Sequence, residues 1–187
     1  MTTRKIDIWK HYAIRDVGPK DEEDLKHYFL SQAISRDPVL SLGNDPPKDQ
    51  GRFKQLSRVC LNQKTLEPGN RVFDGLVVES TYHDRGILYF AGLAYPDSNG
   101  PPSLELHIRE HFAKKDSNYP ILESLRDICL IGIDQNKETE IHARLVSGGR
   151  YLSQMLRKLG FQQLEVNNEE DIWFYAERKD LDDRVFS

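Results

Sequence analysis

The segment Arg144-Leu-Val-Ser147-Gly148-Gly149-Arg150 carries residue types that suit a phosphate or pyrophosphate group. Paired glycines permit a turn in which successive backbone N–H groups converge, and a helix beginning near Arg150 would add the partial positive charge of its N-terminus. The two arginines can donate charge-assisted hydrogen bonds to the same anion. A Gly-Gly pair also occurs in ordinary flexible connections, so the spacing leaves both a phosphate loop and a plain loop open.

A second motif, His107-Ile-Arg-Glu-His111, has the H-x-x-E-H spacing of the inverted zinc-peptidase motif. On a helix this spacing would place both imidazoles on one face with the glutamate near them. The alternative is an amphipathic helix in which His111 helps to cover an apolar stripe of Leu104, Ile108 and Phe112. The sequence offers no clear third ligand, so we expect no metal at this motif.

Two further features can take part in chemistry, a carboxylate beside a proline and a set of aromatic side chains. Asp37 precedes Pro38, and its carboxylate would serve as a general base if partly buried, although Asp-Pro is also an ordinary turn. Most aromatic residues are expected in the core, and some of them can line a cleft for an apolar or aryl substrate. The aromatic set is Tyr28, Phe29, Tyr89, Phe90, Tyr95, Trp173, Phe174 and Tyr175.

The composition excludes several classes of protein. The chain has 187 residues, with 30 Asp and Glu against 26 Lys and Arg, and its net charge of −4 argues against a dedicated nucleic-acid binder. It contains no run of ~18 apolar residues that would span a membrane, and its N-terminus lacks an apolar signal segment. Cys60 and Cys129 form no C-x-x-C pattern and are expected to be reduced, buried thiols. We therefore expect one cytoplasmic domain over residues 1–187.

Periodicity and turn residues predict the order β-α-α-β-β-α-β-α-β-β of an α/β layer structure. The last helix should begin near Arg150, because two adjacent glycines are unfavourable inside a helix, and should end at Gly160. Its predicted core stripe is Leu152, Met155, Leu156 and Leu159. Strands are expected at 12–17, 72–80, 86–95, 128–133, 161–166 and 172–177, with helices beginning at Pro19, near Phe53 and after Ser103.

Several segments together resemble the Gcn5-related N-acetyltransferases (GNATs), and among them the insect-type aralkylamine N-acetyltransferases. Residues 12–24 resemble the opening strand and helix, and Phe29 to Gly43 resembles the D-E-P-L…G segment of that subgroup. The helix expected at 103–115 resembles its insertion. Residues 151–161, which end in Lys-Leu-Gly-Phe, resemble the last helix, and Asp180 to Phe186 resembles the C-terminal tail. The likeness touches most of the chain.

The resemblance implies a single domain with a mixed, mostly antiparallel sheet and helices on both faces. It also implies transfer of an acetyl group from acetyl-CoA to a small amine, of an aryl or a polyamine type. In the family CoA lies between two splayed parallel strands, and its pyrophosphate meets a (Q/R)-x-x-G-x-(G/A) loop at a helix N-terminus. The implied cofactor-binding residues are Ile131, Ile133, Arg144, Ser147, Gly148, Gly149 and Arg150.

The resemblance also implies catalytic residues. Asp37 matches the glutamate of D-E-P-L and is the implied base for the amine proton, with a side chain one methylene shorter. The usual general-acid tyrosine would stand at Leu156, so Tyr151, the only nearby phenol, is the implied replacement.

Two departures from the family pattern favour an alternative. A serine replaces the first glycine of the loop pattern, and too few residues separate the strand expected at 128–133 from Arg150 to hold a further helix and strand. Ornithine decarboxylase antizymes resemble the GNAT fold without a CoA site and act by binding another protein; the arrangement that includes Gly75 to Val78 and Ile87 to Phe90 also resembles their core. The sequence therefore leaves open an N-acetyltransferase and a non-catalytic regulatory protein with a protein partner.

Overall fold

The computed structural model describes residues 12–30, 37–63, 72–81, 86–96, 100–114, 119–145, 149–164 and 172–182. The strands are β1 (Tyr12–Asp16), β2 (Val39–Leu42), β3 (Phe73–Ser80), β4 (Ile87–Ala94), β5 (Ser103–Arg109), β6 (Glu140–Leu145), β7 (Gln162–Gln163) and β8 (Ile172–Glu177). The helices are a 3₁₀ turn, η1 (Pro19–Asp21), then α1 (Glu22–Leu30), α2 (Gln50–Gln63), α3 (Glu110–Lys114), α4 (Tyr119–Asn136), α5 (Gly149–Leu159) and α6 (Arg178–Asp182).

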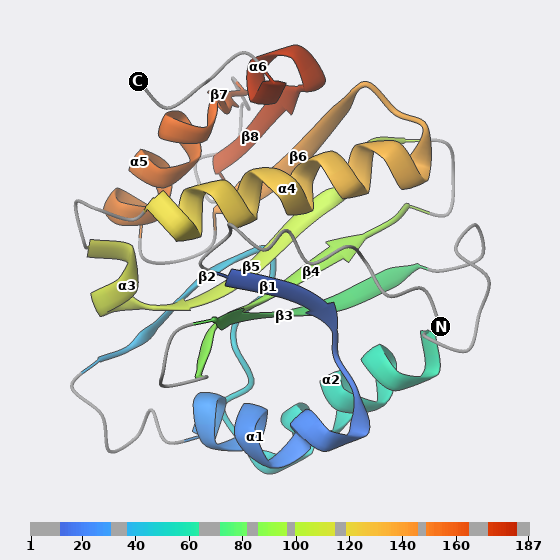
Figure 1. Cartoon of the computed structure of the whole chain (residues 1–187), viewed down its shortest axis with the longest axis vertical. Helices are drawn as coiled ribbons and strands as arrows, with labels where there is room; N and C mark the ends of the chain where they lie inside the picture. Colours follow the sequence, from blue (N-terminus) through green and yellow to red (C-terminus); the bar gives the residue numbers. More distant parts are fainter. Residues whose placement is uncertain are drawn as a thin grey trace.

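Within these residues the strands form one mostly antiparallel sheet in the order β1-β3-β4-β5-β2-β6-β8-β7. Helices α1 and α2 cover one face of the sheet, and α4 and α5 cover the other (Figure 1). This arrangement confirms the predicted fold class, a mixed, mostly antiparallel sheet between two layers of helices. None of the described helices is both long and apolar enough to cross a membrane.

The first face is closed by the amphipathic stripes of α1 and α2. Gly75 on β3 lets α2 approach the sheet, because a Cβ built there would lie 2.5 Å from Sγ of Cys60. Both thiols of the chain are free and buried, as expected. The cluster on this face comprises Val17, Leu25, Tyr28, Phe29, Val39, Phe53, Cys60, Phe73, Val77 and Phe90.

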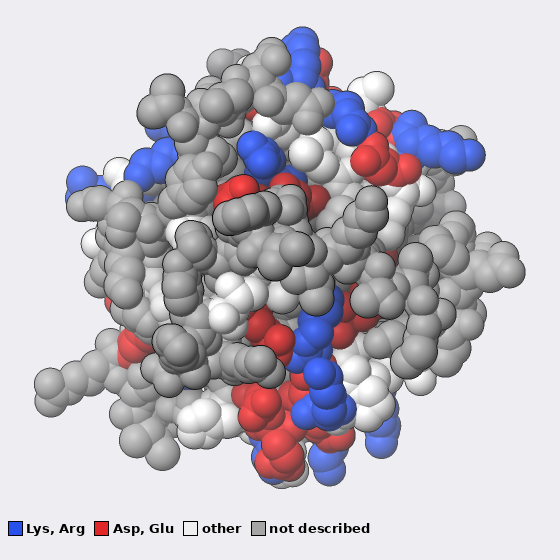
Figure 2. Space-filling model, in the orientation of Figure 1, with Lys and Arg blue, Asp and Glu red and all other residues white. Residues whose placement is uncertain are grey.

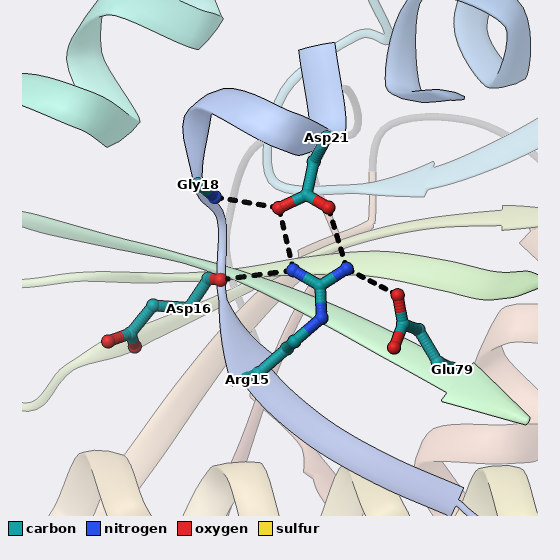
Figure 3. A network of polar contacts seen from close by, with 5 residues as sticks. All are labelled: Arg15, Asp16, Gly18, Asp21 and Glu79. Atoms are coloured by element: carbon teal, nitrogen blue, oxygen red, sulfur yellow. Dashed lines mark hydrogen bonds and ion pairs between the residues drawn. The ribbon is translucent and has the colours of Figure 1, made fainter. Parts of the chain in front are cut away.

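A polar network ties β1, η1 and β3 together (Figure 3). The Arg15 guanidinium donates two hydrogen bonds of 2.6 Å to the Asp21 carboxylate and a third bond to Glu79. Asp21 also accepts a 2.7 Å hydrogen bond from the backbone N–H of Gly18. Burial raises the pKa of Asp21, but Arg15 and the Gly18 N–H outweigh it and hold that pKa below its usual value.

Replacing Asp21 by asparagine is expected to lower the free energy of unfolding at pH 7 by about 2 kcal/mol, because charge-assisted hydrogen bonds are lost in a buried site. Since the pKa is lowered in the folded state, this contribution is present above the unfolded pKa and disappears as pH falls through the folded value. Urea unfolding at pH 7 and at pH 3 measures it, with exposed Asp24→Asn as the control. An equal effect of both substitutions at pH 7 would contradict the prediction.

The opposite face is closed by α4 and α5. The predicted stripe of α5 is confirmed, since Leu152, Met155, Leu156 and Leu159 are all buried. The helix ends at Gly160, whose φ of 105° lies in the region that favours glycine. On α4, Ser124 Oγ lies 2.6 Å from the hydroxyl of Tyr89 in the middle of the sheet, so the helix is anchored by a buried hydrogen bond as well as by apolar contacts.

The structure corrects two predicted elements. The segment that begins at Ser103 is a strand, β5, followed by the short helix α3, and residues 128–133 lie inside α4. Two strands, β6 before the last helix and β2 after α1, were not predicted. Between β5 and α5 the chain therefore contains a further helix, α4, and a further strand, β6. These are the elements for which a strand at 128–133 would have left too few residues. The H-x-x-E-H segment therefore changes from strand to helix after Arg109, so His107 and His111 share no helical face.

Candidate functional site

Strands β5 and β6 are parallel and diverge within the sheet. They pair only at one end, where Ser103 faces His142 and Leu104 faces Ala143. Beyond that point β2 runs antiparallel between them: its four residues pair with 106–109 of β5, and Leu42 pairs with Leu145 of β6. The chain therefore fills the gap between its own splayed strands with a strand from its N-terminal half.

Two arginines hold the ends of β2 in this gap. Arg109 donates hydrogen bonds to the carbonyl oxygens of Asp37 (2.9 Å) and Tyr28 (2.6 Å). At the other end, Nη2 of Arg144 donates to the carbonyl oxygen of Gly43 (2.7 Å), and the Gly43 N–H donates to the backbone oxygen of Arg144 (2.7 Å). Leu42 is only 1% exposed. The strand is thus part of the packed sheet and is fixed at both ends.

Beside this gap lies a cleft of about 390 Å³, between α2, the loop after β2, and β5. Its polar lining contains two carboxylates, one guanidinium, two amides and one imidazole, and its apolar lining comes mainly from α2 and β3. The lining residues are Asn44, Asp45, Pro47, Arg52, Gln55, Leu56, Val59, Phe73, Glu105 and His107. Arg52 on the rim lies near Asp49, with 3.9 Å between Nε and Oδ2, so its charge is partly balanced outside the cleft.

Glu105 is the most buried carboxylate of the cleft, at 8% exposure. Burial raises its pKa above the usual range, although the hydrogen bond from Asn44 and the charge of Arg144 lower it in part. The carboxylate therefore costs stability in its ionised form, and a cationic ligand would add to the counter-charge that Arg144 supplies in part. Buried groups with such shifted pKa values gather at functional sites.

His107 lies two residues from Glu105 on the same face of β5. Its Nδ1 is 2.8 Å from the hydroxyl oxygen of Ser41 on β2, and its ring makes an edge contact with Phe29. Burial lowers the pKa of His107 to about 4, although Asp45 opposes the shift. The imidazole is therefore neutral at pH 7 and does not repel a cation in the cleft.

The floor of the cleft depends on a glycine. Gly92 of β4 pairs with Glu105, and a Cβ built on it would lie 2.3 Å from the Phe73 ring and 3.4 Å from Glu105 Cβ. Because Gly92 has no side chain, the edge of the Phe73 ring can lie across β4. An aromatic ring and a carboxylate that line the same cleft suit the carbon skeleton and the charge of an organic ammonium ion.

The cleft does not contain the residues that the sequence proposed as catalytic. Asp37 is half-buried at the start of β2, and its backbone oxygen is held by Arg109. Tyr151 lies on α5 and packs against the core under the opposite face of the sheet. The structure therefore separates both from Glu105 and His107, and their catalytic roles stay predictions.

The proposed cofactor residues have different positions from those expected. Ile131 and Ile133 lie on α4, so the strand on which their assignment depended is wrong. Gly149 and Arg150 open α5, whereas Ser147 and Gly148 lie outside the described residues. Arg144 is the penultimate residue of β6 and bonds Gly43, as described above. The loop pattern therefore precedes α5, and it does not join β5 to α4.

These observations test the fit of acetyl-CoA, which the resemblance places between the splayed strands. The edge of β5 that would face the cofactor is already paired with β2 over residues 106–109. Residues 110–118, which join β5 to α4, contain no glycine for a phosphate-binding turn. The residues present do not fit acetyl-CoA in this conformation. Among the described residues, no group of three or more His, Cys, Asp or Glu side chains is arranged to hold a metal ion.

Comparison with known proteins identifies the fold. No family model and no curated protein sequence matches the chain. Solved structures do match: a ribosomal-protein-S5-alanine acetyltransferase from Vibrio fischeri superposes with a TM-score of 0.67 and 14% identity, over 92% of this chain and 96% of that one. The chain has the GNAT acetyltransferase fold.

Two further GNAT structures agree. A spermidine N-acetyltransferase from Vibrio cholerae in complex with CoA and spermine gives a TM-score of 0.61 at 9% identity, over 91% of this chain and 98% of that one. A GNAT-family acetyltransferase from Streptococcus pneumoniae gives 0.58 at 11% identity, over 89% and 99%. Identities this low show the fold alone, so the function of this GNAT-fold chain depends on its own residues.

Proposed function

We propose that this chain binds a small amine, of an aryl-alkyl or polyamine type, in the cleft between α2 and β5, and does not acetylate it while β2 fills the gap. The observation that carries the proposal is the pairing of β2 with β5 directly beside a cleft with buried Glu105.

The chemistry of the cleft supports an ammonium ligand. Glu105 provides a buried negative charge that Arg144 offsets only in part, since the pKa of Glu105 stays raised. Asp45 lies 3.6 Å from Lys48, Arg52 lies near Asp49, and His107 is neutral, so the remaining charged groups of the cleft are largely balanced. Charge-assisted hydrogen bonds from an ammonium group to a carboxylate are stronger than neutral ones, and burial from solvent strengthens them further. The Phe73 ring and the apolar side of α2 suit the carbon skeleton of the same ligand.

N-acetylation of the bound amine from acetyl-CoA is the second candidate function. It is supported by Glu105, because this side chain lines the cleft and burial raises its pKa, which makes it a better acceptor for the proton that an attacking amine must lose. It requires β2 to leave the gap. Incubating the full chain with acetyl-CoA and each amine, followed by mass spectrometry of the amine, tests this candidate.

The cytoplasmic location and a protein partner stay predictions.

Isothermal titration calorimetry of the full chain with 2-phenylethylamine and with spermidine tests the proposed function. We expect at least one of the two amines to bind with a dissociation constant below the millimolar range, and acetate and benzoate not to bind. Absence of heat with both amines at millimolar concentration would contradict the proposal, as would preferential binding of the anions.

Amine affinity is also expected to depend on pH. The ammonium binds the ionised form of Glu105, so affinity should fall as pH drops through the pKa of this group, and burial moves that pKa above its usual value. The fall should therefore begin at a higher pH than an exposed glutamate would give. Calorimetry between pH 4 and pH 8 measures it, and an affinity that stays constant over this range would exclude Glu105 as the counter-charge.

A further inference from the structure

Strand β2 borders both the gap and the cleft. Its Ser41 contacts His107, and the residue that follows the strand, Gly43, packs against Glu105, since a Cβ on Gly43 would lie 2.8 Å from Glu105 Cγ. Asn44 then donates a hydrogen bond to Oε1 of Glu105. One wall of the cleft is therefore built by the segment that closes the gap.

The other end of β2 is held outside the cleft. Arg109 bonds the backbone oxygen of Asp37 and lies over the ring of Tyr28, with 5.1 Å between its Cζ and the ring centroid. The hydroxyl of Tyr28 accepts a 3.1 Å hydrogen bond from the Arg109 N–H. Arg109 does not line the cleft, so it acts on a ligand there indirectly, by holding β2 in the sheet and by holding Tyr28, whose hydroxyl donates a 3.2 Å hydrogen bond to the backbone oxygen of His107.

We infer that an amine in the cleft holds β2 in the gap, so that a ligand of the cleft and an extended ligand of the gap exclude one another. The inference rests on the proposed function and names the regulation of the same site. An amine that contacts Glu105 and Asp45 needs the segment 43–45 in place, and this segment is in place only when β2 is paired. A ligand that binds one of two states stabilises that state by its differential affinity.

Amide hydrogen exchange measures how strongly a bound amine stabilises the paired state of β2. If opening of β2 destroys the cleft, saturation with a ligand at 100 times its dissociation constant slows exchange of the β2 amides by about 100-fold. We expect this slowing in residues 39–42 when the full chain is saturated with 2-phenylethylamine or spermidine, whichever calorimetry finds to bind. The amides of β8, which is remote from the cleft, should change much less.

Calorimetry tests the amine site, and hydrogen exchange tests the coupling of that site to β2. Calorimetric binding with unchanged exchange in residues 39–42 would overturn the coupling and leave the amine site intact. Absence of binding by both amines would overturn the proposed function and the coupling together.

Variants at Arg109 give a second test. Arg109→Ala should accelerate exchange of residues 39–42 by about 10-fold without ligand, the loss of one or two charge-assisted hydrogen bonds to backbone oxygens, and saturating amine should slow that exchange again by about 100-fold. Amine affinity should change little, because it falls only with the fraction of chains in which β2 is paired. Arg109→Lys should restore part of the slower exchange. Arg178→Ala, which removes an exposed ion pair with Asp134, is the matched control and should leave the exchange of residues 39–42 unchanged. Exchange in Arg109→Ala that saturating amine does not slow would overturn the inference.

Discussion

Replacing Glu105 by glutamine is expected to weaken amine binding by about 10- to 100-fold. Glutamine keeps the size of the side chain and its hydrogen-bond acceptor, but it removes the charge that pairs with the ammonium group. A hydrogen bond to a charged group is worth about 1.5–3 kcal/mol, which corresponds to this range of affinity. Calorimetry with the same two amines measures the change, and Glu22→Gln on the exposed start of α1 is the control.

The same substitution should leave the protein as stable or make it more stable. The pKa of Glu105 is raised in the folded state, so the folded state holds the proton more tightly than the unfolded chain does. The contribution of the carboxyl group is therefore greatest at low pH and is lost as pH rises through the raised pKa. A variant that binds amine normally, or one that unfolds at lower urea concentration at pH 7, would show that Glu105 has a structural role instead.

Replacing Gly43 by alanine is expected to impair both the fold and the cleft. Gly43 has a φ of 83°, which costs a side-chain-bearing residue about 1–2 kcal/mol, and the new Cβ would meet Glu105 Cγ at 2.8 Å. We expect a loss of about 2 kcal/mol or more in the free energy of unfolding, and a fall of about 4–8 °C in Tm. Amine affinity should fall with it, because Glu105 must move.

Gly149→Ala provides the matched control for this glycine. A Cβ on Gly149 meets no atom within 4 Å, and the residue opens α5. We expect no loss of stability or of amine binding. Differential scanning calorimetry and amine titration of both variants measure the contrast. Equal effects of the two substitutions would contradict the placement of the site at the end of β2.

The local pattern of the sequence was sufficient for some elements of the fold. The hairpin of β3 and β4 has long apolar, β-branched runs, and α5 has a clear stripe bounded by glycines, so both were predicted near their observed bounds. The six-residue apolar run 128–133 predicts a buried strand and a buried helix equally well, because its periodicity does not distinguish the two. Its true element, α4, extends over 18 residues.

Strand β5 carried a signal that the sequence interpretation missed. Leu104, Leu106 and Ile108 alternate with Glu105 and His107, and the three apolar residues face α4 and α5 while the other two face the cleft. This alternation would have placed Glu105 and His107 together on a strand face. The H-x-x-E-H spacing and the apolar residues at helical intervals favoured a helix instead.

Strand β2 is beyond local prediction. It has four residues, all buried, and its partners lie about 65 and 100 residues further along the chain, so only long-range pairing defines it. The resemblance included the segment Asp37 to Gly43, which contains β2, but it assigned this segment the role of supplying a catalytic carboxylate. The structure gives this segment a different position, inside the gap that the resemblance assigned to CoA.

Charge on the surface offers no simpler account of function. On the face shown in Figure 2, acidic and basic side chains of the described residues lie next to one another. Such mixed surfaces are ordinary for a soluble domain and carry little information about a charged partner. The cleft and the filled gap therefore remain the features on which the functional account depends.

We propose that the chain binds an amine without acetylating it because β2 occupies the position that an acyl donor would need. Titration of the full chain with acetyl-CoA, in the presence and absence of 2-phenylethylamine and spermidine, tests this proposal when the amine is recovered for mass spectrometry. We expect no binding of acetyl-CoA up to millimolar concentration and no acetylated amine. Micromolar binding of acetyl-CoA together with an acetylated amine would contradict it and establish the chain as a working N-acetyltransferase.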